Sequence, residues 1–307
     1  MKSCIPVILF SLLLTVMPSC VENIEMVGDD SFYVVECLLT EGTQQNLRVS
    51  TQTAFPPLTD IEANISDLTS GGTQYDFFPY DNNVLSGHFD FTPIPGHEYL
   101  LTIRIDNQTN LTAKTTFPIK AEMDYQAGNG AWDSPYCSLV RVQKKSPNPM
   151  WMWGNYLTQS DYDPQMFTSH ISDEVACDYP GTDSFNLINR ELAAYCTDGS
   201  GTYMHHKFLR LDINEDNASF SVFPYSASKY YLEYPERNNL RAICVSEELD
   251  RILRETAALD FIQGGGDLIE KDSDSWFEVY DHNNYYTNIH GGTGIFGAYV
   301  SCKMNRL

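Results

Sequence analysis

Residues 285–299 read Tyr-Tyr-Thr-Asn-Ile-His-Gly-Gly-Thr-Gly-Ile-Phe-Gly-Ala-Tyr and lie close to the end of the 307-residue sequence. Four glycines alternate there with large apolar residues, a composition typical of backbone that crosses a packed surface where a Cβ atom would clash. Ordering so many glycines costs conformational entropy, which packing must offset. The stretch therefore predicts a late, closing β-strand that completes strands formed earlier in the chain.

Residues 31–120 carry the pattern of short strands separated by turn residues. Apolar and polar residues alternate in several of these segments, for example at Ile61, Ala63 and Ile65, which places one face inward and one in water. The expected strands are 32–39, 47–53, 61–66, 74–79, 87–92, 98–105 and 111–117. Seven short strands in about 90 residues predict an immunoglobulin-like β-sandwich.

Residues 121–135 contain Gly128, Gly130 and Pro135 and are interpreted as a linker. Beyond them, residues 136–307 predict a larger antiparallel β domain. Its expected strands are 136–142, 150–157, 203–213, 219–224, 229–234 and 240–245. One amphipathic helix over 246–262 interrupts them, with Ser246 as the N-cap and apolar residues at helical spacing. The fold class is therefore mainly β, in two domains, with one helix covering a sheet.

The first 19 residues combine Lys2 with an apolar run too short to span a membrane, which is typical of a secretory signal peptide. Met17-Pro18-Ser19-Cys20 resembles a bacterial lipobox, so Cys20 is the expected lipidation site and residues 20–30 the tether. Cleavage nearby by an ordinary signal peptidase is the alternative. The net charge of −22 disfavours nucleic acid as a partner, because the phosphate backbone binds a basic face and the sequence shows none.

Six cysteines remain after the leader and the anchor, and six cysteines permit 15 disulfide connectivities. Cys177 and Cys196 flank one loop-rich excursion, and they are the one pair that the spacing favours. Closing a loop of that size stabilises a fold by roughly 3 kcal/mol. Because no Cys-x-x-Cys spacing occurs, the sequence does not predict a zinc site or a thioredoxin-like centre.

A search for catalytic motifs identifies neither a nucleophile elbow nor a phosphate loop, so no catalytic residue, metal or cofactor is expected. Asp212-x-Asn214-x-Asp216 predicts an acidic turn between strands, with a loose calcium site as the alternative. Exposed aromatics can stack on a sugar or a peptide side chain, and burial in the core is the alternative for them. The candidate ligand-binding aromatics are Trp151, Trp153, Tyr156 and Tyr162.

The closing stretch also resembles the C-terminal signature of DUF4249, a family of Bacteroidetes lipoproteins of unknown function. The resemblance implies a structural role for the matching positions, which are Asn288, Gly292, Gly294, Ile295, Phe296 and Gly297. Further similarity lies at Val34-Val35-Glu36 and in the Pro-Gly-x-x-Tyr motif of residues 95–99. The resemblance carries over no catalytic residues, and it implies a companion of TonB-dependent outer-membrane transporters.

Three hypotheses for function follow from the residues and the resemblance. The first is a lipid-anchored outer-membrane protein that captures or delivers a small-molecule, glycan or peptide ligand without being an enzyme. Its position on the surface or the periplasmic face is left open. The second is a structural or adhesive cell-surface protein. The third is a glycan or peptide hydrolase, which requires a convergent acid and base.

Overall fold

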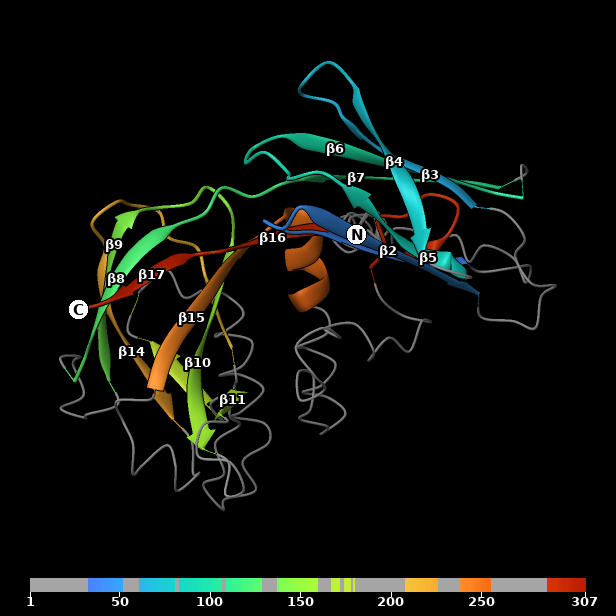
Figure 1. Ribbon diagram of the computed structural model, residues 1–307. Coiled ribbons are helices and arrows are strands. Elements are labelled where there is room, and N and C mark those ends of the chain that lie inside the picture. Colours follow the sequence, from blue (N-terminus) through green and yellow to red (C-terminus); the bar gives the residue numbers. More distant parts are fainter. Residues whose placement is uncertain are drawn as a thin grey trace, which may run out of the picture. The chain divides into compact units, whose positions relative to one another are not determined.

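Seventeen β-strands and one helical segment make up the described part of the chain (Figure 1). The computed structural model describes residues 33–51, 61–80, 83–106, 109–128, 137–159, 167–171, 174–177, 179, 208–225, 238–254 and 286–307. The predicted signal peptide and tether lie outside these ranges. Pairing joins the strands into a 12-stranded and a 5-stranded sheet. The prediction of a mainly β protein with one helix is confirmed.

All seven strands predicted in the first half are present. They are β1 (Tyr33–Leu39), β2 (Gln44–Thr51), β3 (Ile61–Asp67), β4 (Thr73–Tyr80), β5 (Asn83–Asp90), β6 (Glu98–Ile105) and β7 (Thr109–Thr116). One set pairs in the order β1-β2-β5-β4 and a second in the order β3-β6-β7, which is the pairing of an immunoglobulin-like sandwich. Strand β4 also pairs with β3, so the two sets form one continuous sheet.

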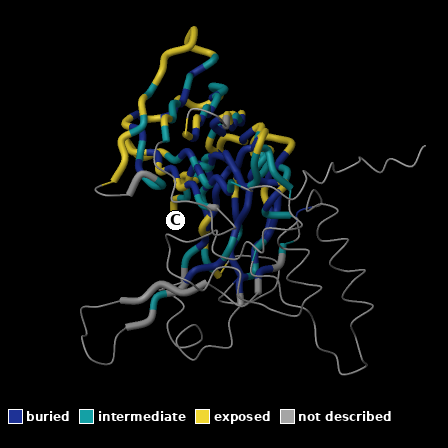
Figure 2. Tube along the Cα trace, turned by 90° about the vertical axis from the view of Figure 1, so that its right-hand side faces the viewer, coloured by how far each residue is buried: buried dark blue, intermediate teal, exposed yellow. Residues whose placement is uncertain are grey.

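Alternation along these strands builds their core (Figure 2). In β6, Tyr99, Leu101, Ile103 and Ile105 are each at most 1% exposed, whereas Arg104 between the last two is exposed. The Tyr99 hydroxyl accepts a hydrogen bond from the Ile94 backbone N–H at 2.8 Å. The buried polar atom therefore has a partner, and the aromatic ring adds its full apolar area to the core.

The predicted closing strand is β16 (Thr293–Ser301). It pairs in parallel with β1, with Gly294 opposite Val35, and its C-terminal end pairs antiparallel with β15 (Asn238–Val245). His290, just before it, forms a β-bridge with Thr112 of β7. The end of the chain thus contacts both β1 and β7, the outer strands of the first half, so the prediction that it completes earlier strands is confirmed.

The side chain at position 288 must be an amide, because it both accepts and donates hydrogen bonds. Asn288 Oδ1 accepts from the Phe296 backbone N–H at 3.0 Å, and its Nδ2 donates to the Phe296 carbonyl at 2.8 Å. The same Nδ2 lies 3.0 Å from the Lys114 carbonyl of β7. One side-chain amide therefore takes the place of a neighbouring strand for β16, and a carboxylate could not supply the two donated bonds.

The predicted linker over 121–135 requires a correction, because residues 122–127 form strand β8 (Glu122–Ala127). Met123 and Tyr125 are buried and alternate with polar residues, which is the period-2 pattern of a strand. The interpretation as a linker gave more weight to the glycines and the proline that follow. Strand β8 pairs with β9 (Ser138–Lys144) and lies parallel to β17 (Lys303–Arg306). The 5-stranded sheet is completed by β14 (Ser219–Tyr225) and β12 (Glu174–Cys177).

The second half is not separate from the first, since β16 joins β1 to the strands that follow. These are β15, β10 (Met150–Gln159) and β11 (Phe167–Ile171), with β13 (Leu209–Leu211) also paired to β10. Residues 32–307 accordingly form one compact unit. The strand predicted over 229–234 lies outside the described residues.

The predicted helix is present over 247–254, and the rest of its predicted span lies outside the described residues. Ser246 is the N-cap, because its Oγ accepts from the Leu249 backbone N–H at 3.3 Å. Its backbone N–H donates to the Ala298 carbonyl at 2.9 Å, which fixes the start of the helix on β16. Leu249 packs with Ile243 and Val245, so this helix covers a face of the sheet as predicted.

Candidate functional site

The predicted aromatic site on β10 is largely core. Trp151 is only 4% exposed and packs beneath the helix with Ile243 and Leu249. Trp153 is half-buried, and its ring meets Phe208 edge-on at 5.9 Å between centroids. The two tryptophans share a sheet face as expected, but that is the face the helix covers. Trp151 therefore cannot reach a ligand, and its assignment as a ligand-binding residue is corrected.

The other two candidate aromatics are not placed. Tyr156 belongs to β10, and its side chain lies outside the described part of the structure, as does the whole of Tyr162. The predicted pair of Cys177 and Cys196 has a similar outcome. Cys177 ends β12 and its Sγ accepts from the Tyr179 backbone N–H at 3.3 Å, whereas Cys196 lies outside the described residues.

Trp151 belongs to a buried polar network. Its Nε1 donates to Asp250 Oδ1 at 2.9 Å, and Arg210 forms two bonds to the same carboxylate, at 2.8 and 2.9 Å. Burial lowers the pKa of Arg210, but its bonds to Asp250 and Asp212 outweigh this and raise that pKa above its ordinary value. Because these groups satisfy one another, the network joins the helix to β10 and β13 and leaves no group directed at a ligand.

Asp67, His97 and Ser70 bring together the three residue types of a hydrolytic triad. Asp67 Oδ2 lies 2.9 Å from His97 Nδ1, but the Ser70 hydroxyl approaches that same nitrogen at 3.3 Å. A triad needs the acid and the nucleophile on different ring nitrogens. Asp67 Oδ1 instead accepts the backbone N–H groups of Thr69 and Ser70, so the arrangement caps a turn.

The pKa of Asp67 is consistent with this capping role. Burial raises it, but the hydrogen bonds from His97 and Ser70 and the charge of His97 outweigh burial, and the net pKa is lower than usual. A carboxyl that must serve as a general acid needs a raised pKa instead. The carboxylate form is therefore the one that the turn stabilises.

The acidic stretch at 212–216 forms the turn between β13 and β14, as predicted. Lys145 occupies its oxygens, since its backbone N–H donates to Asp216 Oδ1 at 2.8 Å and its Nζ donates to the Asn214 carbonyl at 2.6 Å. No group of three or more metal-ligating side chains is present among the described residues. Two oxygens that a loose calcium site would use are thus already bonded to Lys145.

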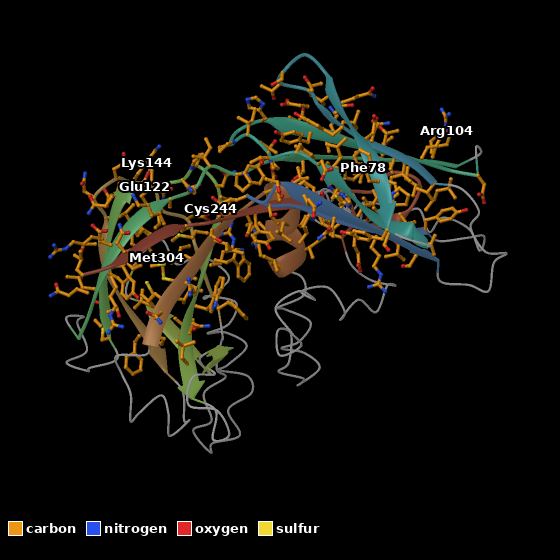
Figure 3. The ribbon with its side chains drawn as sticks, viewed as in Figure 1. Phe78, Arg104, Glu122, Lys144, Cys244 and Met304 are labelled. Carbon is orange, nitrogen blue, oxygen red and sulfur yellow. The ribbon has the colours of Figure 1, made fainter. Side chains whose placement is uncertain are left out.

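An exposed aromatic cluster lies on the outward face of the first half and consists of Phe78, Tyr80 and His88. Phe78 and Tyr80, both on β4, are 49% and 43% exposed. Figure 3 labels Phe78. The His88 ring on β5 lies 5.8 Å from the Phe78 ring and 5.3 Å from the Tyr80 ring, measured between centroids. These rings form a patch on the strand surface whose exposure to water is unfavourable.

Polar groups border this cluster along one row of the sheet. Phe78 is opposite His88, and His88 is opposite Asn46 of β2, so the row crosses three strands. The Tyr80 hydroxyl donates to Asn46 Oδ1 at 2.6 Å, and His88 Nε2 lies 3.3 Å from Asp90 Oδ1. The row therefore combines ring faces with amide, hydroxyl and carboxylate groups.

His88 contributes one further polar atom. Its Nδ1 is buried and has no hydrogen-bond partner within the described ranges. In the tautomer whose Nε2–H donates to Asp90, Nδ1 is an acceptor. An unsatisfied buried acceptor costs free energy, but this atom is closed to the surface and is not part of the rim that a ligand meets.

The sequence indicates this cluster, but the predicted site was based on the denser aromatic residues of the second half. Phe77, Phe78 and Pro79 fall within the strand predicted over 74–79, and Tyr80 follows it directly; successive side chains of a strand point to opposite faces. Phe77 packs against Phe89 of the core, so Phe78 must face outward, and Tyr80, beyond the register shift, is exposed as well. The register shifts between Pro79 and Tyr80, where proline has no N–H to donate.

Two general properties complete the description of the site. No helix in the described part of the chain has the length and the apolar character to cross a membrane. The chain matches no protein-family model and no curated protein.

Proposed function

We propose that the protein is a lipid-anchored, non-enzymatic accessory of a TonB-dependent uptake system, and that the exposed aromatic cluster captures a neutral saccharide. The observation that carries the proposal is the contact of Phe78, Tyr80 and His88 on an open sheet face. Large apolar side chains are mostly buried, and a group of them in contact on the surface is typical of a binding site.

The ligand class follows from the chemistry of the cluster. Sugar rings present apolar C–H faces that stack on aromatic rings, while their hydroxyls need donors and acceptors at the rim. Asn46 and Asp90 supply such groups beside the rings. Because the chain carries a net charge of −22, a neutral ligand is favoured over an anionic one.

The rest of the proposal comes from the sequence. A lipid on Cys20 would hold the sandwich at the outer membrane, since three acyl chains exceed the two signals that stable attachment requires. The transporter partner follows from the resemblance to the DUF4249 family. The described residues bring no pair of catalytic carboxyl groups to the cluster, and such a surface suits capture or delivery better than hydrolysis.

Alanine in place of Phe78 or Tyr80 is expected to weaken saccharide binding at least about tenfold, because each removes a ring that contributes about 1.4 kcal/mol or more. Isothermal titration with neutral hexasaccharides of glucose, xylose and mannose measures the affinity. The thermal midpoint should stay unchanged, since both side chains are exposed.

Ile94→Ala is the matched control, because Ile94 is 45% exposed but belongs to the connection between β5 and β6, outside the cluster. Its affinity should equal that of the native protein. Saccharide binding that survives both Phe78→Ala and Tyr80→Ala, or the lack of saturable binding by the native protein, would refute capture at this cluster.

A further inference from the structure

Two cysteines that are distant in sequence meet where the two sheets join. Cys244 belongs to β15, and Cys302 stands between β16 and β17. Their Sγ atoms are 3.3 Å apart, although 58 positions separate the residues. Sequence spacing gives no reason to pair them, and their proximity arises from the antiparallel pairing of β15 with β16.

The backbone fixes this proximity. Cys244 is opposite Val300 in the β15–β16 pair, and the Cys302 backbone N–H donates to the Ala242 carbonyl at 2.9 Å. Cys244 and Cys302 therefore occupy diagonal positions on adjacent strands, from which side chains on one face reach each other. Figure 3 labels Cys244 at this place. Sulfurs at this separation reach the ~2.05 Å of a disulfide bond when the two side chains rotate toward each other.

The two sulfurs differ in character. Cys244 is fully buried, whereas Cys302 is partly exposed. Their mutual hydrogen bond lowers the pKa of Cys244 and, together with burial, raises the pKa of Cys302. Cys37, by contrast, is buried in the sandwich, where burial alone raises its pKa. The thiolate is therefore favoured on Cys244, and an incoming reagent meets Cys302 first.

We propose that Cys244 and Cys302 form a disulfide that ties β15 to the junction of β16 and β17. The oxidant is a disulfide-exchange donor of the exported compartment that the leader predicts. The Cys302 thiol, whose proton the neighbouring Cys244 thiolate accepts, attacks one sulfur of the donor and releases a donor thiolate, which takes that proton from Cys244 and leaves as a thiol. Cys244 then attacks the Cys302 sulfur of the mixed disulfide and releases the second donor thiol. The pair loses two electrons and two protons, and the donor gains both.

This cross-link would act on both sheets. Strand β15 belongs to the 12-stranded sheet, and β17, which begins just after Cys302, belongs to the 5-stranded sheet. The closed loop spans residues 244–302, and constraining a loop of that length reduces the conformational entropy of the unfolded chain. The disulfide would thus hold the last strands in place when the rest of the chain loosens.

Peptide mapping of the full chain, exported to the periplasm and purified without reductant, tests the pairing. Free thiols are alkylated in denaturant before digestion with trypsin, which releases residues 242–251 and 272–303. We expect these two peptides as one linked species, which reductant separates. In the Cys302→Ser variant, peptide 242–251 should appear alone and alkylated. Recovery of both native peptides alkylated without reduction, or linked to other cysteines, would overturn the proposal.

Thermal unfolding gives a second readout that does not depend on mapping. Reductant should lower the midpoint of the native protein by at least about 5 °C more than that of a Cys244→Ala/Cys302→Ala variant. The variant corrects for any other disulfide that the reductant opens. Equal shifts in the two proteins would show that no stabilising bond joins this pair.

Discussion

Replacing Asp250 by alanine is expected to lower the free energy of unfolding by about 3 kcal/mol or more. The carboxylate and Arg210 are 7% and 6% exposed, and they face each other with two hydrogen bonds. Removing Asp250 leaves most of a buried guanidinium without its partner and also orphans the Trp151 indole N–H. The large cost comes from the uncompensated buried charge, more than from the loss of attraction.

Asp212→Ala provides the matched control, because Asp212 binds the same arginine at 2.6 Å but is 41% exposed. Its loss should cost no more than about 1 kcal/mol, as is usual for a solvated ion pair. Urea unfolding of both variants, followed by tryptophan fluorescence, compares the two costs. Equal costs for Asp250→Ala and Asp212→Ala would contradict a buried pair that holds the helix on the sheet.

Alanine at Gly294 is expected to prevent stable folding, with a loss of about 4 kcal/mol or more. Gly294 has φ of +104°, a conformation that favours glycine. A Cβ atom there would collide with the Val35 carbonyl oxygen and lie 2.8 Å from the Val35 nitrogen. Both atoms belong to the backbone of β1, so no side chain can rotate away, and the parallel pair of β1 and β16 must separate.

Gly71→Ala separates steric collision from backbone strain. Gly71 also has a positive φ, +78°, but a Cβ added there meets no atom within 4 Å. Its cost should be limited to strain, about 1–2 kcal/mol. Soluble yield and urea midpoints of the two variants measure the difference. If Gly294→Ala proves as stable as Gly71→Ala, the tight approach of β16 to β1 is not needed for folding.

Local pattern determined how much of this fold could be predicted. Apolar and polar residues alternate clearly in the strands around Ile61 and Ile103, and Ser246 predicts the start of the helix. Both signals are local, because periodicity and capping depend on neighbouring residues. Strand β8 was missed because Gly128, Gly130 and Pro135 dominated the interpretation of a short segment. Local pattern could not predict that β16 joins the two halves, since strand pairing depends on residues far apart in sequence.

The site illustrates the same limit. Periodicity correctly placed Trp151 and Trp153 on one sheet face, but it could not say that the helix covers that face. Conversely, Phe78 lies in a predicted strand and Tyr80 directly after it, and only the packing of Phe77 against buried Phe89 on the other side shows which face is open. Cys244 and Cys302 meet through tertiary pairing alone. Which face is covered is decided by packing, which one strand's sequence does not contain.

A pull-down of the tagged full-length protein from detergent-solubilised outer membranes tests the proposed uptake role most directly. A Cys20→Ala variant, which cannot be lipidated, is processed in parallel. The proposal predicts near-stoichiometric recovery of a TonB-dependent transporter with the native protein and a weaker or lost association with the variant. Recovery of no transporter with the native protein, together with a variant that stays membrane-bound, would contradict both the partner and the lipid anchor.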